Sequence, residues 1–215
     1  MRIKWFGHSC FMITSENGAK ILLDPYKNAL GYKLPKNIEA HIVTTSHDHS
    51  DHNYINSVKG EFVHISKTGN FSEHGIEIKG IETFHDKVSG AKKGKNIVYS
   101  FNIDGINICH CGDLGHILNE EQIKELGKVD ILFLPVGGGY TIDAFDAAKV
   151  MEQLTPTVVI PMHYRTKALG PIGLSFEKVD KFIAATGVEA KKYGELELNK
   201  ANINDYSGIV VLKYD

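Results

Sequence analysis

Four potential metal ligands stand close together in the first quarter of the chain. Residues 45–53 read TSHDHSDHN and supply His47, His49, Asp51 and His52 directly after a strand-forming run at 41–45. Imidazole and carboxylate groups are the ligands that proteins use for zinc, iron and manganese. Because burying unpaired polar groups is costly, a metal explains this spacing better than a solvated polar loop does. The pattern therefore predicts a metal site at the end of a strand.

The length and charge of the chain limit its organisation and its partners. A chain of 215 residues fits one large domain, so we expect a single domain over residues 1–215. The net charge is −2 and no long basic run is present, which argues against nucleic acid as a partner. The N-terminus lacks the apolar core of a signal peptide, and no stretch approaches the length of a membrane span. We therefore expect no membrane partner.

Cysteine usage indicates the compartment. The chain has three cysteines, Cys10, Cys109 and Cys111, and the last two are too close in sequence to suggest a structural bridge. An odd number of unbridged cysteines is typical of a reducing environment. A soluble cytoplasmic protein is the resulting expectation.

Hydrophobic patterning predicts a sheet-rich first half followed by alternating strands and helices. Short apolar runs fall at 2–6, 10–14, 20–23, 41–45, 61–65, 76–84, 97–103 and 106–111. Helices are predicted at 119–126, 143–154 and 175–186, and strands at 130–134 and 157–162. Asn119 and Ser175 are predicted N-caps, and Gly127 and Gly187 stand where C-terminal glycines belong. About fifty residues at the C-terminal end carry little pattern.

Three further histidine and aspartate residues follow predicted strands. His85 ends the run at 81–85, Asp113 follows the run at 108–112, and His163 ends the run at 158–163. Side chains at strand ends project from a rigid edge, so residues that share this position can meet in one pocket. Each residue alone would be unremarkable, and their repeated position is what makes them candidate ligands.

These residues resemble the metallo-β-lactamase superfamily. The pattern His47-x-His49-x-Asp51-His52, a later His, the pair Gly112-Asp113 and a final His occur in the family's order between about residues 6 and 165. An early Gly7-His8-Ser9 and the pair Asp24-Pro25 are similar to a bacterial branch of small stand-alone hydrolases. That branch contains the ascorbate-6-phosphate lactonase and is related to the N-acyl phosphatidylethanolamine phospholipase D. The resemblance implies an α/β (α+β) fold, a four-layer αββα sandwich with metals at one edge between the sheets.

Carried over to this chain, the family's ligand set implies two divalent metal ions. His47, His49 and His85 would hold one ion, Asp51, His52 and His163 the other, and Asp113 would bridge them. Asp51, Asp113 and His163 are the predicted catalytic residues. His110 competes with His85 for its place, but in an extended strand residues 110 and 113 face opposite ways, which favours His85. Zinc is the expected metal, with manganese or iron as alternatives, because nitrogen and oxygen ligands suit all three.

Charge in such a site favours an anionic substrate. Two aspartates and a bridging hydroxide would supply three negative charges against the four positive charges of two divalent ions, which leaves a net charge of about +1. Such a site suits a small phosphodiester, lactone, ester or amide attacked by hydroxide, without a Ser or Cys nucleophile. The resulting hypothesis is a dinuclear metal-dependent hydrolase acting on a small molecule.

Several residues near the motif are candidates for supporting roles. Asp24 and Asp48 could accept the second N–H of a ligand imidazole, although a turn-forming Asp-Pro and a solvated loop carboxylate explain them equally well. His8 is expected to line the rim of the pocket rather than bind metal, because seven ligands already complete the sites. His116 could approach the substrate or simply lie on the surface ahead of a helix.

Two glycine-rich stretches, 136–143 and 90–96, are expected to form the mouth of the pocket, since glycines let backbone approach a ligand closely. Tyr140 and Tyr164 could donate to a developing oxyanion. Lys92, Lys93, Lys95 and Arg165 could neutralise an anionic group, although a lysine run is more often a solvated face.

Two other functions fit the same motif. The first is a redox protein like the diiron oxygen reductases, which is disfavoured because those proteins carry a carboxylate where this chain has His49 and because no flavin domain is attached. The second is a metal-binding scaffold without turnover, which would not need an intact ligand set. The resemblance also makes a homo-oligomer reasonable.

Overall fold

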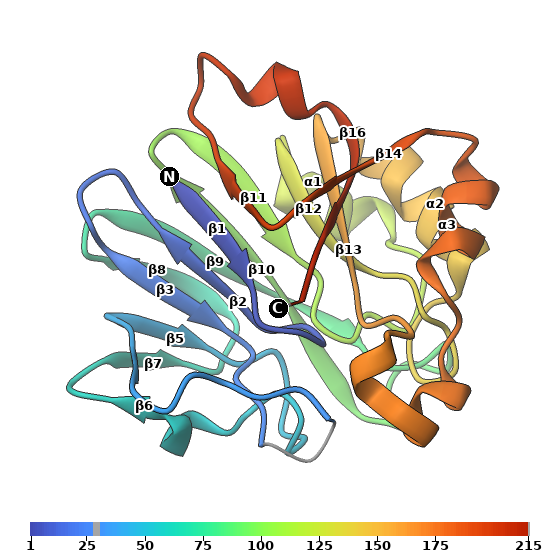
Figure 1. Ribbon diagram of the computed structural model, residues 1–215, viewed down its shortest axis with the longest axis horizontal. Coiled ribbons are helices and arrows are strands. Elements are labelled where there is room, and N and C mark those ends of the chain that lie inside the picture. Colours follow the sequence, from blue (N-terminus) through green and yellow to red (C-terminus); the bar gives the residue numbers. More distant parts are fainter. Residues whose placement is uncertain (28–30, 215) are drawn as a thin grey trace.

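The apolar runs of the first half are divided between the two sheets of a sandwich: those at 2–65 contribute to the first sheet and those at 76–111 to the second (Figure 1). The computed structural model describes residues 1–27 and 31–214. Within them, the first sheet has six strands, in the order β15 (Glu195–Glu197), β1 (Arg2–Trp5), β2 (Phe11–Thr14), β3 (Lys20–Leu23), β5 (Ile42–Thr44) and β7 (Val63–Ile65). In β1 exposed and buried residues alternate, so Ile3 and Trp5 face the core while Arg2 and Lys4 face solvent.

The second sheet contains eight strands within the described residues. Their order is β14 (Ala190–Tyr193), β16 (Gly208–Leu212), β13 (Val158–Met162), β12 (Ile131–Pro135), β11 (Ile106–His110), β10 (Lys95–Ile103), β9 (Ile76–Phe84) and β8 (Gly69–Glu73). Every residue of β12 and β13 is buried, as expected for central parallel strands covered on both faces. Two short strands, β4 (Ile38–Glu39) and β6 (Val58–Lys59), form a separate pair.

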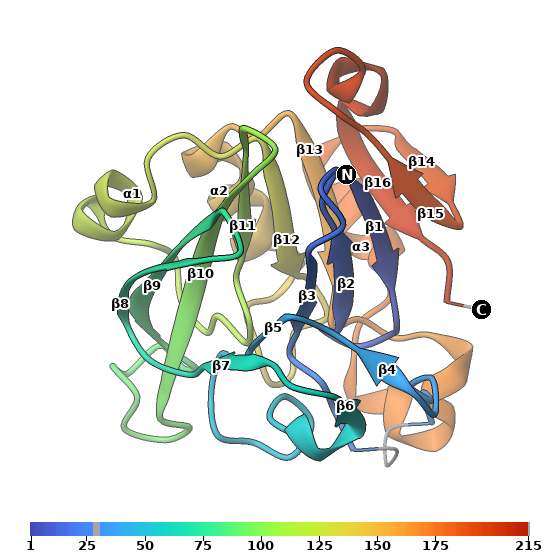
Figure 2. The same ribbon diagram turned by 90° about the vertical axis from the view of Figure 1, so that its left-hand side faces the viewer.

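Three α-helices of the described chain follow β11 and are associated with the second sheet. α1 (Glu120–Leu126) packs on β9, α2 (Ala144–Leu154) packs on β12, and α3 (Val179–Thr186) packs on α2 (Figures 1 and 2). A capping box joins Asn119 to Gln122, and Gly127 and Gly187 end α1 and α3, so these predicted helix ends are confirmed. None of the described helices has the length and apolar character needed to cross a bilayer.

The predicted N-cap Ser175 is wrong. Residues Lys167–Ser175 (η2) form two short 3₁₀ turns joined at Gly170, and α3 begins only at Val179. The backbone between them is held extended, because the Glu177 N–H donates to Gly137 O at 2.7 Å and the Arg165 N–H donates to Glu177 O at 2.8 Å. These long-range hydrogen bonds outweigh the local helical pattern.

Strands β8, β14, β15 and β16 were not predicted. β16 lies between β13 and β14 in parallel pairing, and β15 pairs antiparallel with β1 at the edge of the first sheet. The edge strand β14 carries two lysines and β8 is mostly polar, so neither has the apolar alternation that marks a strand. The pairing partners of β8 and β14, rather than their own sequences, define these two strands, whereas the buried apolar run of β16 was missed by the sequence analysis.

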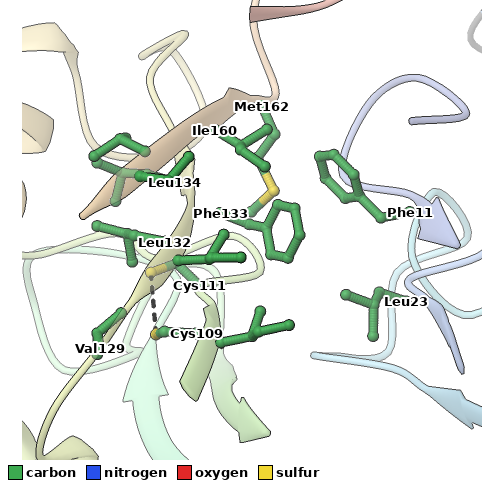
Figure 3. Close-up of a cluster of buried hydrophobic side chains, with 14 of the residues drawn as sticks. Phe11, Leu23, Cys109, Cys111, Val129, Leu132, Phe133, Leu134, Ile160 and Met162 are labelled. Atoms are coloured by element: carbon green, nitrogen blue, oxygen red, sulfur yellow. Dashed lines mark hydrogen bonds between the residues drawn. The ribbon is translucent and has the colours of Figure 1, made fainter. Parts of the chain in front are cut away.

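The main core lies between the two sheets and under the helices. Phe11 of the first sheet meets Phe133 of the second with ring centroids 4.3 Å apart (Figure 3). Cys109 and Cys111 are buried free thiols whose sulfur atoms are 4.0 Å apart in the same core. A second cluster, including Leu22, Val43 and Tyr32, lies on the other side of the first sheet. There the fourth layer consists, within the described residues, of loops, β4, β6 and η2 rather than of α-helix.

Strand direction gathers the ends of six strands at one edge. In the first sheet, β1 and β3 are both antiparallel to β2 and β3 is parallel to β5, so β1, β3 and β5 share one direction. In the second sheet, β9 and β11 are both antiparallel to β10, and β11, β12 and β13 are parallel, so β9, β11 and β13 share one direction. The predicted site residues follow these strands. The two packed sheets, the helices on the second sheet and the placement of the polar edge therefore agree with the fold that the resemblance implies, although the outer layer over the first sheet contains no α-helix within the described residues.

Replacing Phe133 with alanine is expected to lower the free energy of unfolding by about 3–5 kcal/mol, because it leaves a cavity between the sheets. Equilibrium denaturation in guanidinium chloride measures the change. Phe145→Ala on α2 is the matched control, because this ring is 57% exposed, and it should alter stability by about 0.5 kcal/mol or less. Equal losses in the two variants would contradict the placement of Phe133.

Candidate metal centre

The loop after β5 folds so that its histidines face one another. The N–H groups of His52 and Asn53 both donate to His49 O, at 2.9 and 3.0 Å, which makes a tight turn. His47 Nε2 then lies 2.9 Å from His49 Nδ1. His85, directly after β9, joins them, and the three residues place one potential ligand atom each within 4.8 Å of one another. These are the three histidines that the sequence predicted for one ion.

A second group of imidazoles lies beside the first. His8, His52 and His163 also bring one ligand atom each within 4.8 Å of one another, and all three are buried. The His163 N–H donates to His8 O at 3.2 Å, and the Trp5 indole N–H donates to the same oxygen at 3.0 Å. His8 and His163 both have left-handed backbone, with φ of 53° and 52°. Strain of this kind persists only where surrounding contacts enforce it.

Asp113 lies between the two groups. Its carboxylate oxygens are 3.1 Å from His52 Nε2, 3.1 Å from His85 Nε2, 3.4 Å from His163 Nε2 and 3.9 Å from His47 Nε2. Asn96 fixes this residue by accepting the Asp113 N–H at 2.9 Å and by donating to Cys111 O at 3.0 Å. Gly112 precedes it with φ of 53°, and a Cβ there would lie 2.5 Å from both Asn96 and Ser46. Only glycine fits that position.

Asp51 occupies the border of the second group. Its Oδ2 is 3.3 Å from His8 Nε2 and 3.9 Å from His52 Nε2, and its side chain is about one-third exposed. The structure therefore adds His8, predicted only as a rim residue, to the candidate ligands beside Asp51. The sequence signal that could have found His8 is its place after β1, the same strand-end position as the other candidates.

His110 points away from both groups. Its Nε2–H donates to Ser9 O at 2.9 Å, and its ring lies about 6 Å from those of Phe11 and Phe133. Within the described residues no ligand group includes it. The structure thus brings His85, and not His110, to the predicted position.

A buried carboxylate orients two of the imidazoles. Asp24, which follows β3 with φ of 43°, accepts from His52 Nδ1 at 2.8 Å and from Ser46 Oγ at 2.6 Å. Ser46 Oγ is in turn 3.0 Å from His47 Nδ1. Because these bonds engage the Nδ1 atoms, the Nε2 atoms of His47 and His52 are left facing Asp113. Asp48, by contrast, is exposed and accepts from the Asn53 side chain.

The electrostatics of the centre keep Asp113 ionised. Burial favours its neutral form, but the imidazoles of His163 and His52 hold the pKa of Asp113 well below its usual range. Burial would also lower the pKa of His52, yet the carboxylates of Asp113 and Asp24 outweigh it and raise that pKa well above its ordinary value. Burial, aided by His52, lowers the pKa of His47 to about 3. His47 is therefore neutral at neutral pH, the form in which imidazole binds metal.

The donor set fits divalent metal ions. Within the described residues, His52 Nε2 and Asp113 Oδ1 are buried without a hydrogen-bond partner although they lie only 3.1 Å apart. Buried polar atoms normally find partners, and ones that face a common space instead are typical of a ligand-binding site. Nitrogen and carboxylate oxygen together suit zinc, manganese or iron.

A cavity of about 630 Å³ opens onto this centre. Its polar lining includes His49, Asp51, His85, Asp113 and His163, together with Asp48, Ser50 and Lys93. Its apolar lining consists of Tyr140, Ile172 and Phe176. Tyr140 and Lys93 come from the two glycine-rich stretches that the sequence placed at the mouth of the pocket.

Three predicted substrate residues lie outside this cavity. The Tyr164 ring stacks on Trp5 with centroids 5.5 Å apart, and burial raises the pKa of its hydroxyl. Arg165 lines a different depression with Lys167 and Lys178. The His116 ring bonds backbone instead, since its Nε2 accepts the Phe84 N–H at 3.1 Å and its Nδ1–H donates to Ile117 O at 2.8 Å. These residues support the fold rather than the cavity.

The conformation of the loop that carries Lys93 to the cavity depends on Asp86, a residue that the sequence analysis did not identify. Its carboxylate accepts four backbone N–H groups, from Val88, Gly90, Lys92 and Lys93, at 2.7–2.9 Å. Burial favours the neutral acid, but these four bonds hold the pKa of Asp86 well below its usual range. The loop they order carries Lys93 to the mouth of the cavity.

Comparisons with known proteins agree with this geometry. A family model described as a β-lactamase superfamily domain matches residues 2–163. The chain belongs to the metallo-β-lactamase superfamily. It is a metal-dependent hydrolase of that superfamily, as the motif predicted.

The similar proteins cover between 77% and 99% of this chain. A UPF0173 metal-dependent hydrolase of Methanosarcina mazei is 30% identical over 196 residues, which cover 77% of this chain and 84% of that protein. A Thermotoga maritima structure, described as a Zn-dependent hydrolase of the metallo-β-lactamase superfamily, is 39% identical with a TM-score of 0.81, covering 98% of this chain and 97% of the other. A metallo hydrolase of Ignicoccus hospitalis shares the fold, with 22% identity, a TM-score of 0.71, and coverage of 99% and 94%. The narrower likeness to the lactonase branch stays a prediction.

Asp24→Asn is expected to weaken metal binding about 10- to 100-fold, because the amide cannot accept the His52 Nδ1–H and the Ser46 hydroxyl as the carboxylate does. Titration of metal-free protein against a competing chelator measures the affinity. Asp48→Asn is the control, since Asp48 is exposed and bonded only to Asn53 among the described residues, and it should change the affinity little. A similar loss in both variants would argue against orientation by Asp24.

Asp86→Ala is expected to speed amide hydrogen exchange across residues 86–94 by about tenfold or more, because four N–H groups lose their acceptor. Exchange followed by mass spectrometry reports on this loop. Lys92→Ala removes an exposed side chain of the same loop and keeps the backbone bond, so its exchange should match that of the wild type. Unchanged exchange in Asp86→Ala would refute the role of the carboxylate.

Proposed function

We propose that the chain binds two divalent metal ions and uses them to hydrolyse a small anionic substrate. The observation that carries this proposal is the position of Asp113, whose carboxylate lies 3.1–3.9 Å from imidazoles of both histidine groups. A carboxylate in that position can be shared by two ions. A single ion would leave one of the two groups of imidazoles without a metal to bind.

The residues divide between the two ions as follows. His47, His49 and His85 would hold the first ion, and His52 and His163 the second, with Asp51 and His8 beside it. Zinc is the metal we favour, with manganese or iron as alternatives, because the set contains only nitrogen and oxygen donors. When bound, such ions polarise the scissile group and lower the pKa of a water molecule that serves as nucleophile.

The surroundings of the centre support an anionic substrate. Lys93 lines the cavity that opens onto the histidines, and it also lines a neighbouring depression of about 460 Å³. Lys67 and Lys95 line that second depression, which shares Asp48 and His49 with the cavity, and Lys95 pairs there with Glu82 at 2.7 Å. Lys93 and Lys67, which have no such carboxylate partner among the described residues, would attract a phosphodiester, a lactone or another ester that carries negative charge.

Asp113→Asn is expected to lower hydrolysis at least about a hundredfold and to remove at least one of two metal equivalents, because the amide oxygen carries no charge for the ions to share. Elemental analysis and a screen of phosphodiesters, lactones and other esters measure both quantities.

The control for this variant is Asp205→Asn, an exposed aspartate far along the chain whose replacement should alter neither quantity. Two metal equivalents and full activity in Asp113→Asn would overturn the shared carboxylate. One equivalent in the fully loaded wild type would overturn the dinuclear assignment.

A further inference from the structure

One wall of the cavity is apolar and open to solvent. Ile172 and Tyr140 are each 49% exposed, and both line the cavity beside the candidate metal centre. Large apolar side chains left in water are unfavourable when they cluster, and a cluster inside a concave site is typical of ligand binding. The third member of this wall, Phe176, is buried beneath them.

The apolar wall is continuous with the histidines. The Phe176 ring lies 5.0 Å from the His163 ring and 5.5 Å from the Tyr140 ring, measured between centroids. A group that rests on Ile172 or Tyr140 is therefore adjacent to the centre where hydrolysis is proposed. This continuity distinguishes the wall from an apolar patch elsewhere on the surface.

Backbone hydrogen bonds hold the wall in place. The Phe176 N–H donates to Gly173 O at 3.1 Å, the next residue donates to Gly137 O at 2.7 Å, and the Tyr140 N–H donates to Gly138 O at 2.6 Å. These bonds tie η2 to the glycine-rich turn that carries Tyr140. The apolar surface is thus formed before any substrate binds, which limits the entropy lost on binding.

A cation lies at the edge of the same wall. Lys93 Nζ donates to Tyr140 O at 2.6 Å and is 5.3 Å from the centroid of the Tyr140 ring. The lining of the cavity also contains Asp48, His49 and Asp51. The cavity therefore combines an apolar surface with polar groups and the metal centre.

We propose that the substrate is amphiphilic: its anionic hydrolysable group meets the histidine centre, and a neighbouring aromatic ring or short alkyl chain rests on Ile172, Tyr140 and Phe176. A cavity of about 630 Å³ accommodates one such group beside the scissile bond. The inference rests on the proposed function for the hydrolysis, while the apolar preference is a separate property of the wall.

Binding of phosphonates tests the apolar preference without turnover. Phenylphosphonate is expected to bind the metal-loaded protein about tenfold more tightly than methylphosphonate, measured by titration calorimetry. Ile172→Ser should remove most of this difference. Leu174→Ser is the matched control, because Leu174 is 70% exposed in the same segment and does not line the cavity, so it should preserve the difference.

The outcomes separate this inference from the proposed function. Equal affinity for the two phosphonates in the wild type, or the same loss in Leu174→Ser as in Ile172→Ser, overturns the apolar subsite. Binding of neither phosphonate overturns the anionic part of the inference. A dimer that both serine variants dissociate, seen by light scattering, assigns the wall to an interface between copies and also overturns the inference.

Hydrolysis provides the second readout. With phosphodiester or carboxylic ester substrates that differ only in a methyl or a phenyl group, Ile172→Ser should raise the KM of the phenyl substrate more than that of the methyl substrate, whereas Leu174→Ser should leave both KM values near those of the wild type. A phosphonate preference without hydrolysis of any ester would keep the subsite and refute the proposed reaction.

Discussion

The structure of this edge of the sandwich depends on one buried carboxylate. Asp113 is 2% exposed and is surrounded by imidazoles on both sides. An ionised group at that depth is tolerated only where opposite charges or hydrogen-bond donors compensate its desolvation. Two neighbouring residues keep the carboxylate among these imidazoles. Asn96 fixes the backbone of Asp113, and Gly112 allows the chain to pass close to Ser46.

A second constraint is the orientation of the rings. Asp24 and Ser46 engage the Nδ1 side of His52 and His47, so that their Nε2 atoms converge on the same space. His8, Asp24 and His163 all adopt left-handed backbone at this edge, although none is glycine. Because three strained residues lie at one edge, we infer that the packing around them keeps their backbone in this conformation instead of letting it relax.

The cavity in front of this centre has polar and apolar lining that comes from different parts of the chain. The polar lining comes from the motif loop after β5 and from the residues that follow β9, β11 and β13, whereas the apolar lining comes from η2, the adjacent Phe176 and the glycine-rich turn before α2. Lys93 joins them, because the loop ordered by Asp86 brings its ammonium group to Tyr140. The metal centre is common to the superfamily fold, whereas such a wall can set which substrates reach it.

The sequence by itself determined the parts of the site that depend on local spacing. The His47 to His52 motif lies within one turn, and His85, Asp113 and His163 each follow an apolar strand, so strand periodicity and family resemblance were enough to choose them. The central strands β12 and β13 were equally predictable, because continuous apolar runs of five residues are shorter than a typical helix and suit strands covered on both faces.

Only the tertiary structure decided the rest. His8 joins His52 and His163 because strands from both sheets end at one edge, which no local pattern reveals. Tyr164 and Arg165 follow His163 directly, yet the left-handed turn at His163 directs Tyr164 onto Trp5 and Arg165 away from the cavity. The polar edge strands and the start of α3 were likewise set by partners distant in the chain. Local sequence specifies a residue's chemistry and its strand, whereas its neighbours across the sandwich depend on how the two sheets pack.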